Sequence, residues 1–304
     1  MEIQYGKQVK INDIKGKTID LFICVENHEK RSYTLYNTLI NNNNRIDNEI
    51  VFCYKDIDYK VDVFKSKNIT NNHTQVIKII EEEIQKIDKE NIDLVIDYSC
   101  MTKSWYYSII LYLKNKESRF KNINAYFSYT PSKFEEPKKP KPNKDIAPLP
   151  GKYAVPTDKP KALIVCLGYE QNKAEGIIEH LDPKKYYLFY TKPASDKKFV
   201  NTIESNNKNI LQEKSNHIIT YPFNDLISIE KELTRLYFYL KDEYSIIIAP
   251  LGPKPFSFIS MMLSVKYLDI DIWRVGSGSD INEYDNEPID DKSFVICKVI
   301  FSND

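Results

Sequence analysis

Apolar residues along the chain follow two alternating patterns, short continuous runs and longer segments with helical spacing. A continuous apolar run is typical of a strand buried on both faces, and apolar residues three to four apart indicate an amphipathic helix. In the first half, strands are predicted at 21–25, 50–54, 94–98 and 123–129, and helices at 29–39, 76–87 and 103–113. In the second half, strands are predicted at 162–167, 186–191, 217–223, 245–250, 270–275 and 293–301, and helices at 174–181, 196–212, 227–240 and 255–267. Strands that alternate with helices predict an α/β fold with mainly parallel sheets.

The two halves also resemble each other. Residues 21–39 align without a gap on 163–181, and Lys103 aligns with Lys254, each lysine between an apolar strand and an amphipathic helix. Repeats of this kind define the architecture. We therefore expect two tandem Rossmann-like domains, at 1–135 and 161–304, separated by a linker at 136–160.

The linker is rich in proline and lysine. Proline stiffens a chain and removes hydrogen-bond donors, so this composition favours a semi-rigid connector. The alternative is a lysine-rich lid over a shared anionic site.

Composition excludes several classes of protein. The 43 basic and 43 acidic residues cancel, which argues against bulk binding of duplex nucleic acid, although a local basic site is still allowed. No apolar run reaches the length of a membrane span, and the N-terminus lacks a signal-peptide core, so a cytoplasmic protein is expected. The five cysteines form no CxxC pair and the four histidines are scattered, so neither a metal site nor a cofactor is expected.

In open α/β sheets, ligands bind beyond the carboxyl ends of the strands, where the strand order reverses. We expect this switch point in each half between the first strand and the strand before the lysine. The loops facing it would be 26–31 with 97–103 and 168–173 with 250–255. A helix start offers free backbone N–H groups, and an added lysine and hydroxyl suit a phosphate or a polar base edge.

The candidate ligand-binding residues come from these loops and from one strand. Two glycines would allow close backbone approach, the loop glutamates would contact a ribose hydroxyl or, as we favour, cap a helix, and the strand arginine would pair with a carboxylate or reach the site. The candidates are Glu26, Asn27, Asp97, Ser99, Thr102, Lys103, Gly168, Glu170, Gly252, Lys254 and Arg274.

The motif D-Y-S-C-M-T-K at Asp97–Lys103 resembles a turn of the CARF domains, the CRISPR-associated Rossmann-like sensors, and of the related SAVED sensors. There an acidic residue ends a strand and is followed by Ser or Thr and then by Lys or Arg at the helix start. The resemblance implies binding of cyclic or linear oligonucleotide second messengers across a paired site, with this chain as a covalent pseudo-dimer. The second copy departs from the motif, since Ile248 replaces the acidic residue and Pro250 the hydroxyl.

Three functions are compatible with these patterns. The favoured one is a nucleotide-sensing protein, for which the resemblance implies a role in prokaryotic antiviral defence. The second is a scaffold or partner subunit of a multiprotein complex whose pocket has decayed. The third is a nucleotide- or nucleoside-processing enzyme using Asp97, Ser99 and Lys103. No histidine lies on the lysine turns and no second carboxylate adjoins Asp97, so no catalytic residue is assigned.

Overall fold

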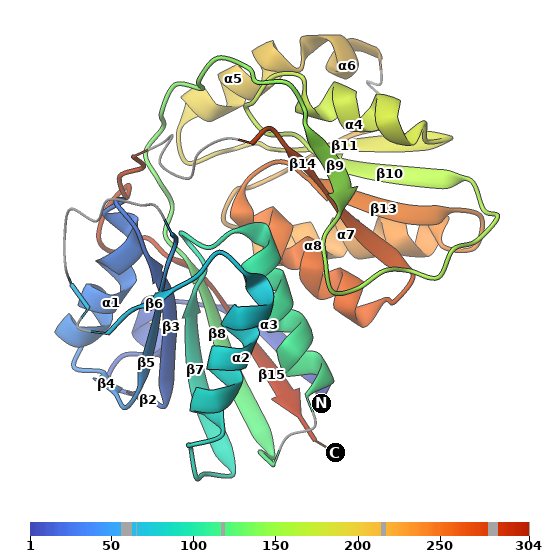
Figure 1. Cartoon of the computed structure of the whole chain (residues 1–304). Helices are drawn as coiled ribbons and strands as arrows, with labels where there is room; N and C mark the ends of the chain where they lie inside the picture. The colour runs from blue at the N-terminus through green and yellow to red at the C-terminus, as the bar shows by residue number, and fades with distance from the viewer. Residues whose placement is uncertain (56–62, 65, 117–118, 214–216, 279–284, 304) are drawn as a thin grey trace. The chain divides into compact units, whose positions relative to one another are not determined.

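The chain folds into two compact units (Figure 1). The computed structural model describes residues 1–55, 63–64, 66–116, 119–213, 217–278 and 285–303. Unit 1 comprises Met1–Lys133 and Ile281–Asp304, and unit 2 comprises Phe134–Asp280. Unit 2 is thus inserted into unit 1, which differs from the predicted division: the second domain begins before 161 and ends before the C-terminal strand.

Unit 1 is a doubly wound sheet in the strand order β1-β15-β8-β7-β3-β5-β6. The strands from β8 to β6 run parallel, and β15 pairs antiparallel with both β8 and β1. The strands are β1 (Glu2–Val9), β3 (Leu21–Glu26), β5 (Glu49–Cys53), β6 (Asn68–Ile69), β7 (Asn91–Asp97), β8 (Asn122–Tyr129) and β15 (Val295–Ser302), with β2 (Thr18–Ile19) and β4 (Arg45–Ile46) forming a separate pair. The helices are α1 (Arg31–Asn41), α2 (His73–Ile84) and α3 (Lys103–Asn115), with a short 3-10 turn at Ile11–Asp13.

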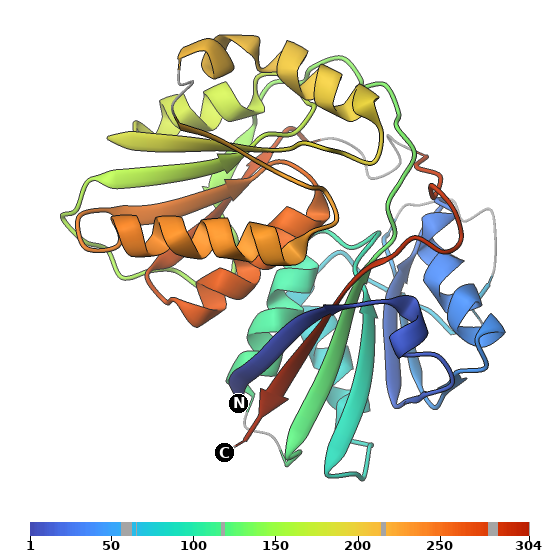
Figure 2. The same ribbon diagram turned by 180° about the vertical axis from the view of Figure 1, so that it is seen from behind.

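The sheet of unit 2 has the strand order β12-β11-β10-β13-β14-β9. Neighbouring strands in it run parallel, except that β9 pairs antiparallel with β14. The strands are β9 (Asp145–Pro148), β10 (Lys161–Cys166), β11 (Lys185–Thr191), β12 (Ile218–Tyr221), β13 (Ser245–Pro250) and β14 (Ile270–Gly276). The helices are α4 (Lys173–Leu181), α5 (Lys197–Asn206), α6 (Lys208–Glu213), α7 (Leu226–Leu240) and α8 (Lys254–Lys266). Figure 2 shows α7 and α8 on one face of this sheet and α4 and α5 on the other.

The structure confirms the α/β, Rossmann-like fold with mainly parallel sheets predicted from the apolar pattern. It also bears out the alignment of the two lysines, because α3 begins at Lys103, α8 begins at Lys254, and each helix is 13 residues long. The expected linker is more than a connector, since it supplies β9 to the sheet of unit 2.

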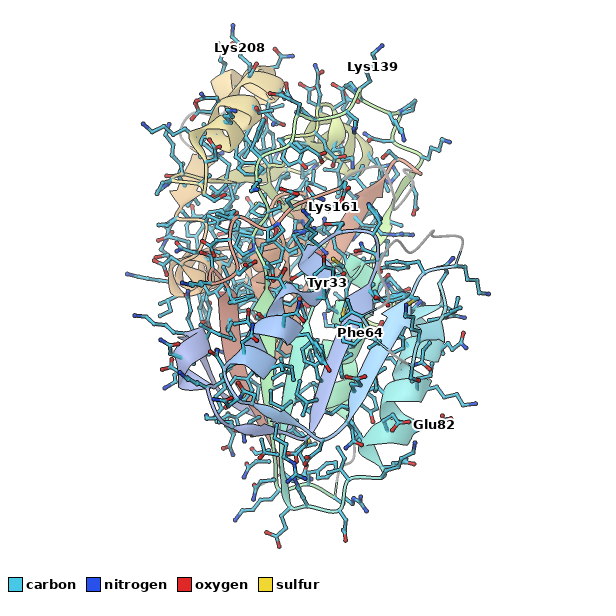
Figure 3. All side chains as sticks on the ribbon, turned by 90° about the vertical axis from the view of Figure 1, so that its left-hand side faces the viewer. Tyr33, Phe64, Glu82, Lys139, Lys161 and Lys208 are labelled. Carbon is cyan, nitrogen blue, oxygen red and sulfur yellow. The ribbon has the colours of Figure 1, made fainter. Side chains whose placement is uncertain are left out.

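Each sheet is buried by the helices that cover it. In unit 1, Leu35 and Leu39 of α1 belong to one apolar cluster with Phe22 of β3 and with Phe64. Tyr33 of α1 is partly buried against the same cluster, and Figure 3 labels it together with Phe64. In unit 2 a second cluster joins α4 and α5 to β10, β11 and β13. These two cores fix the carboxyl ends of the strands, from which the candidate loops emerge.

Candidate functional site

The strand order reverses between β3 and β7 in unit 1 and between β10 and β13 in unit 2. In unit 1 the chain passes from β3 to β5 and β6 on one side of β3 and then returns to β7 on its other side. In unit 2 it passes from β10 to β11 and β12 and then returns to β13 on the other side of β10. The sequence predicted both switch points. Because adjacent parallel strands end at the same edge of a sheet, the loops after β3 and β7 lie side by side. The candidates Glu26, Asn27, Asp97, Ser99, Thr102 and Lys103 therefore share one edge of unit 1.

Asp97 and Ser99 form a buried clamp at the end of β7. Asp97 Oδ1 accepts hydrogen bonds from both Ser99 N, at 3.0 Å, and Ser99 Oγ. Ser99 Oγ in turn accepts a hydrogen bond of 2.8 Å from Thr130 N, directly after β8. All three residues are at most 2% exposed, so the Ser99 hydroxyl joins two loops and is not presented to solvent as a nucleophile.

Glu26 and Asn27 hold local structure at the end of β3. The Glu26 carboxylate is 1% exposed, lies 2.7 Å from Lys67 Nζ, and accepts a hydrogen bond of 3.2 Å from Val63 N. Asn27 Oδ1 accepts a hydrogen bond of 2.9 Å from Glu29 N and shapes the turn into α1. The favoured expectation that Glu26 caps a helix is therefore wrong, because its carboxylate binds the segment that follows β5.

Arg31, at the start of α1, is a charged residue of this edge that sequence reasoning did not select. Its guanidinium is bound to Glu29 by contacts of 2.6 and 2.8 Å, and Nη1 lies 3.4 Å from both Tyr129 Oη and the Thr130 carbonyl. Burial by itself would lower the pKa of Arg31, but Tyr129 and Glu29 outweigh it and raise the pKa, so the guanidinium stays charged. The repeat carried the signal, because Arg31 aligns with Lys173.

The start of α3 combines a lysine with two hydroxyls. Thr102, Lys103 and Ser104 are half-buried, and Thr102 Oγ1 lies 3.1 Å from Ser104 Oγ. Thr102 N donates to the Tyr54 phenol oxygen at 2.9 Å, and the phenol donates to the Cys100 carbonyl at 2.9 Å. Burial raises the pKa of Tyr54, so it acts here as a neutral donor that fixes the turn. Tyr54 was also missed, because its partners lie 46 and 48 residues away.

The helices at the switch points differ from three other helices of the fold in whether their N-cap side chain makes a capping hydrogen bond. The N-cap side chains of α2, α5 and α7 accept a hydrogen bond from a first-turn N–H, and the caps are Asn72, Asp196 and Asp225. The N-cap side chains of α1, α3, α4 and α8 form no such bond, and these four helices follow the two strands on either side of each switch point. First-turn N–H groups without a capping side chain suit an anionic ligand.

In unit 2 the corresponding loops close on each other. A Cβ at Gly168 would lie 2.6 Å from the Leu251 carbonyl oxygen, and a Cβ at Gly252 would lie 2.5 Å from Cys166 Sγ and 2.7 Å from the Leu167 carbonyl oxygen. The close approach that these glycines were expected to give a ligand is therefore made by the neighbouring loop. Asn207 Nδ2 also donates to the Gly168 carbonyl at 3.0 Å.

The other candidates of unit 2 have partners on the protein. Glu170 Oε2 lies 2.6 Å from Lys173 Nζ at the start of α4. Arg274 Nη2 on β14 lies 2.5 Å from Asp145 Oδ2 on β9, so it pairs with a carboxylate, the first of its two expected roles. Lys254 is half-buried at the start of α8. The two units thus share a topology but differ in what fills their switch points.

The chain matches no protein-family model, and a search of curated proteins finds no match. Within the described residues, no three His, Cys, Asp or Glu side chains are grouped so that they could hold a metal ion. Among the described helices, none has the length and apolar character needed to cross a bilayer.

Proposed function

We propose that unit 1 is a sensor for a small nucleotide, held through its phosphate at the switch point between β3 and β7. The observation that carries the proposal is the start of α3, where Thr102, Lys103 and Ser104 are half-buried and the side chain of the N-cap, Thr102, makes no capping hydrogen bond. A phosphate at this position would interact with first-turn N–H groups, the helix dipole and the lysine.

The start of α1 lies on the same edge and supports the proposal. Its N-cap, Lys30, makes no side-chain cap, and the charged Arg31 is fixed in place by Glu29. The ion pair with Glu29 offsets the charge of Arg31, so the part of Arg31 is to hold the start of α1 in place before a ligand binds. The resemblance of the Asp97–Lys103 turn to CARF and SAVED sensors extends the proposal to cyclic or linear oligonucleotide messengers.

Binding without catalysis is the form of the proposal that the contacts favour. A nucleophile must be able to reach its substrate. Ser99 is fully buried and its hydroxyl is already hydrogen-bonded to Asp97 and Thr130, so it is not placed to attack a ligand. In unit 2, Gly168 and Gly252 pack against the facing loops, so we assign this second copy a structural role and no ligand.

The test is a thermal-shift panel with AMP, ATP, NAD, and linear and cyclic oligonucleotides, followed by calorimetry on whichever ligand stabilises the protein. A ligand at a hundred times its Kd stabilises the folded state by about 2.7 kcal/mol, enough to raise Tm by several degrees. Lys103→Ala should weaken binding by about tenfold to a hundredfold, since a hydrogen bond to a charged group contributes about 1.5–3 kcal/mol.

Lys254→Ala is the matched control, because it removes the aligned lysine from unit 2 and should leave the affinity unchanged. Equal affinity of Lys103→Ala and the unmodified chain would contradict the proposed site. A flat panel would favour the second function, a scaffold subunit. The exposed aromatic residues of α7 are compatible with that function, since Phe238 is 53% and Tyr239 66% exposed.

A further inference from the structure

One face of the sheet in unit 1 is only partly covered by a helix. Figure 1 shows α2 and α3 in front of β7 and β8, on the other face. Figure 2 shows the sheet from behind, where none of the described helices lies across β7, β8 and β15. On this side α1 packs over β3, whose Phe22 shares an apolar cluster with Leu35 and Leu39. The rest of the face, which we call the open face, can therefore carry polar side chains, as sheets that expose one side to water do.

Two lysines lie side by side on the open face. In β15, Cys297 and Val299 are buried on the covered side, and Lys298 between them is half-buried on the open side. Lys298 is directly opposite Lys7 of β1 on one side and Tyr126 of β8 on the other. Directly opposed residues of antiparallel strands have Cβ atoms about 4.5–5.5 Å apart, and like charges in such a pair are destabilising. An anion bound between the two lysines would relieve this repulsion.

A third lysine approaches the same tyrosine. The backbone carbonyl of Lys17, just before β2, accepts a hydrogen bond of 3.0 Å from Asn44 Nδ2, which holds the turn. Lys17 Nζ lies 5.5 Å from the centre of the Tyr126 ring, and Lys298 Nζ lies 5.6 Å from the same centre. Three ammonium groups thus gather near one aromatic ring. We call Lys7, Lys17 and Lys298 the lysine triad.

Carboxylates near the open face bind other groups. Asp93 Oδ1 on β7 accepts a hydrogen bond of 2.7 Å from Asn124 Nδ2, and Asp20 is paired with Lys89. Over the part of the chain that the structure describes, no ion pair joins a carboxylate to any member of the triad. The triad therefore keeps positive charge that a ligand can neutralise.

The pKa of Lys298 reflects this arrangement. Burial lowers it, and Lys17 and Lys7 lower it further, while Asp93 acts in the opposite direction. Like charges near a lysine disfavour its charged form, so both neighbours are close enough to interact with the Lys298 ammonium group.

Tyr126 adds a hydrogen-bond donor beside the lysines. Its side chain is 3% exposed, and its hydroxyl oxygen accepts a hydrogen bond of 3.3 Å from Lys17 Nζ. Burial raises the pKa of Tyr126 in spite of Lys17, so the hydroxyl keeps its proton. Among the described residues, no acceptor takes that proton. A buried donor that lacks an acceptor costs free energy, which an anion at this position would recover.

We propose that the lysine triad and the Tyr126 hydroxyl form a second anion site on unit 1, for a ligand that carries a phosphate dianion. Phosphate oxygens accept charge-assisted hydrogen bonds from several donors at once, and two negative charges match a cluster of three ammonium groups and one carboxylate better than a single charge does. The site lies on β1, β8 and β15. It does not depend on the nucleotide site proposed at the start of α3.

The test is equilibrium dialysis of the full chain with radiolabelled inorganic phosphate, at constant ionic strength. Lys298→Gln should weaken phosphate binding about tenfold to a hundredfold, because a hydrogen bond to a charged group is lost. Tyr126→Phe keeps the ring and should weaken binding about tenfold through the hydroxyl alone. Lys78→Gln is the matched control, since it makes the same change in net charge at an exposed position of α2 and should bind as the unmodified chain does.

Lys7→Gln gives a second readout. It should weaken phosphate binding and also raise Tm in the absence of phosphate, because it removes one of two directly opposed charges from an exposed position. A surface lysine with no part in a site would not couple these two effects.

AMP distinguishes the source of the phosphate. If AMP binds more tightly than inorganic phosphate and Lys298→Gln removes the difference, the ligand is an organic phosphate; equal affinities indicate the free anion, and either result supports the site. Equal affinities of Lys298→Gln and Lys78→Gln would overturn it. So would loss of phosphate binding in Lys103→Ala but not in Lys298→Gln, which would place the phosphate at the switch point. Absence of phosphate binding at millimolar concentration would leave the lysines the role of keeping the edge strand β1 from pairing with another chain, and would also overturn the proposal.

Discussion

At the scale of single residues, the glycines show how one property can serve two purposes. Both Gly168 and Gly252 were expected to allow a close approach, and both do, but the approaching atoms belong to the facing loop. Strands β10 and β13 are hydrogen-bonded neighbours, so the loops that leave them start only about 4.8 Å apart. Glycine lets the two loops pack without side chains between them.

Gly252→Ala should therefore destabilise unit 2. The new methyl group would lie 2.5 Å from Cys166 Sγ and 2.7 Å from a backbone oxygen, and overpacking of this kind costs about 1–3 kcal/mol. Gly6→Ala is the control, because its methyl group would meet nothing closer than 3.7 Å. Urea unfolding followed by circular dichroism measures both variants. Similar midpoints would show that the two loops can move apart.

Sequence reasoning succeeded at this scale where the signal was local. The repeat located Lys103 and Lys254 at helix starts, because a strand, a turn and an amphipathic helix are all readable within about twenty residues. It missed the burial of Arg31, because the chain that covers this residue, at Tyr129 and Thr130, lies nearly a hundred residues away.

At the scale of elements, capping side chains decide where helices begin. The predicted helix 196–212 is divided into α5 and α6, and Asn207 stands between them with its side chain bonded to the Gly168 and Ile203 carbonyls. Apolar spacing continues through such a break, so the pattern could not locate it. Boundaries depend on hydrogen bonds made by single polar side chains.

Asp225→Ala should destabilise α7 by about 1 kcal/mol, because the Asp225 carboxylate accepts bonds from Ser228 N and Ser228 Oγ at 3.0 and 2.6 Å. These bonds lower the pKa of Asp225 below its ordinary value of 3.8. The contribution is therefore complete above pH 3.8 and is lost as pH falls through the lower folded-state pKa. Thermal unfolding from pH 7 to pH 2.5 should show the Tm difference shrink in acid. Asp158→Ala, on an exposed loop, is the control and should leave Tm at pH 7 unchanged.

At the scale of the whole molecule, the chain order of strands does not determine which sheet each one joins. The C-terminal strand was located within two residues, yet it was assigned to the second domain, where its neighbours in sequence lie. It instead lies between β1 and β8 in unit 1. An apolar run shows that a strand is buried, but it carries no information about the partner, and consecutive strands are neighbours in only about two thirds of cases.

Phe301→Ala tests this division, because Phe301 is fully buried in β15. Removing a buried phenylalanine side chain costs about 3–5 kcal/mol, and that loss should fall on unit 1. Hydrogen exchange with mass spectrometry should show faster exchange in peptides from β7 and β8, while peptides from β10 and β13 keep their protection. Phe238→Ala, at a position 53% exposed on α7, should leave both sets unchanged. Faster exchange confined to unit 2 would mean that the C-terminal strand belongs with the second sheet. An equal increase in both units would mean that they unfold as one cooperative structure.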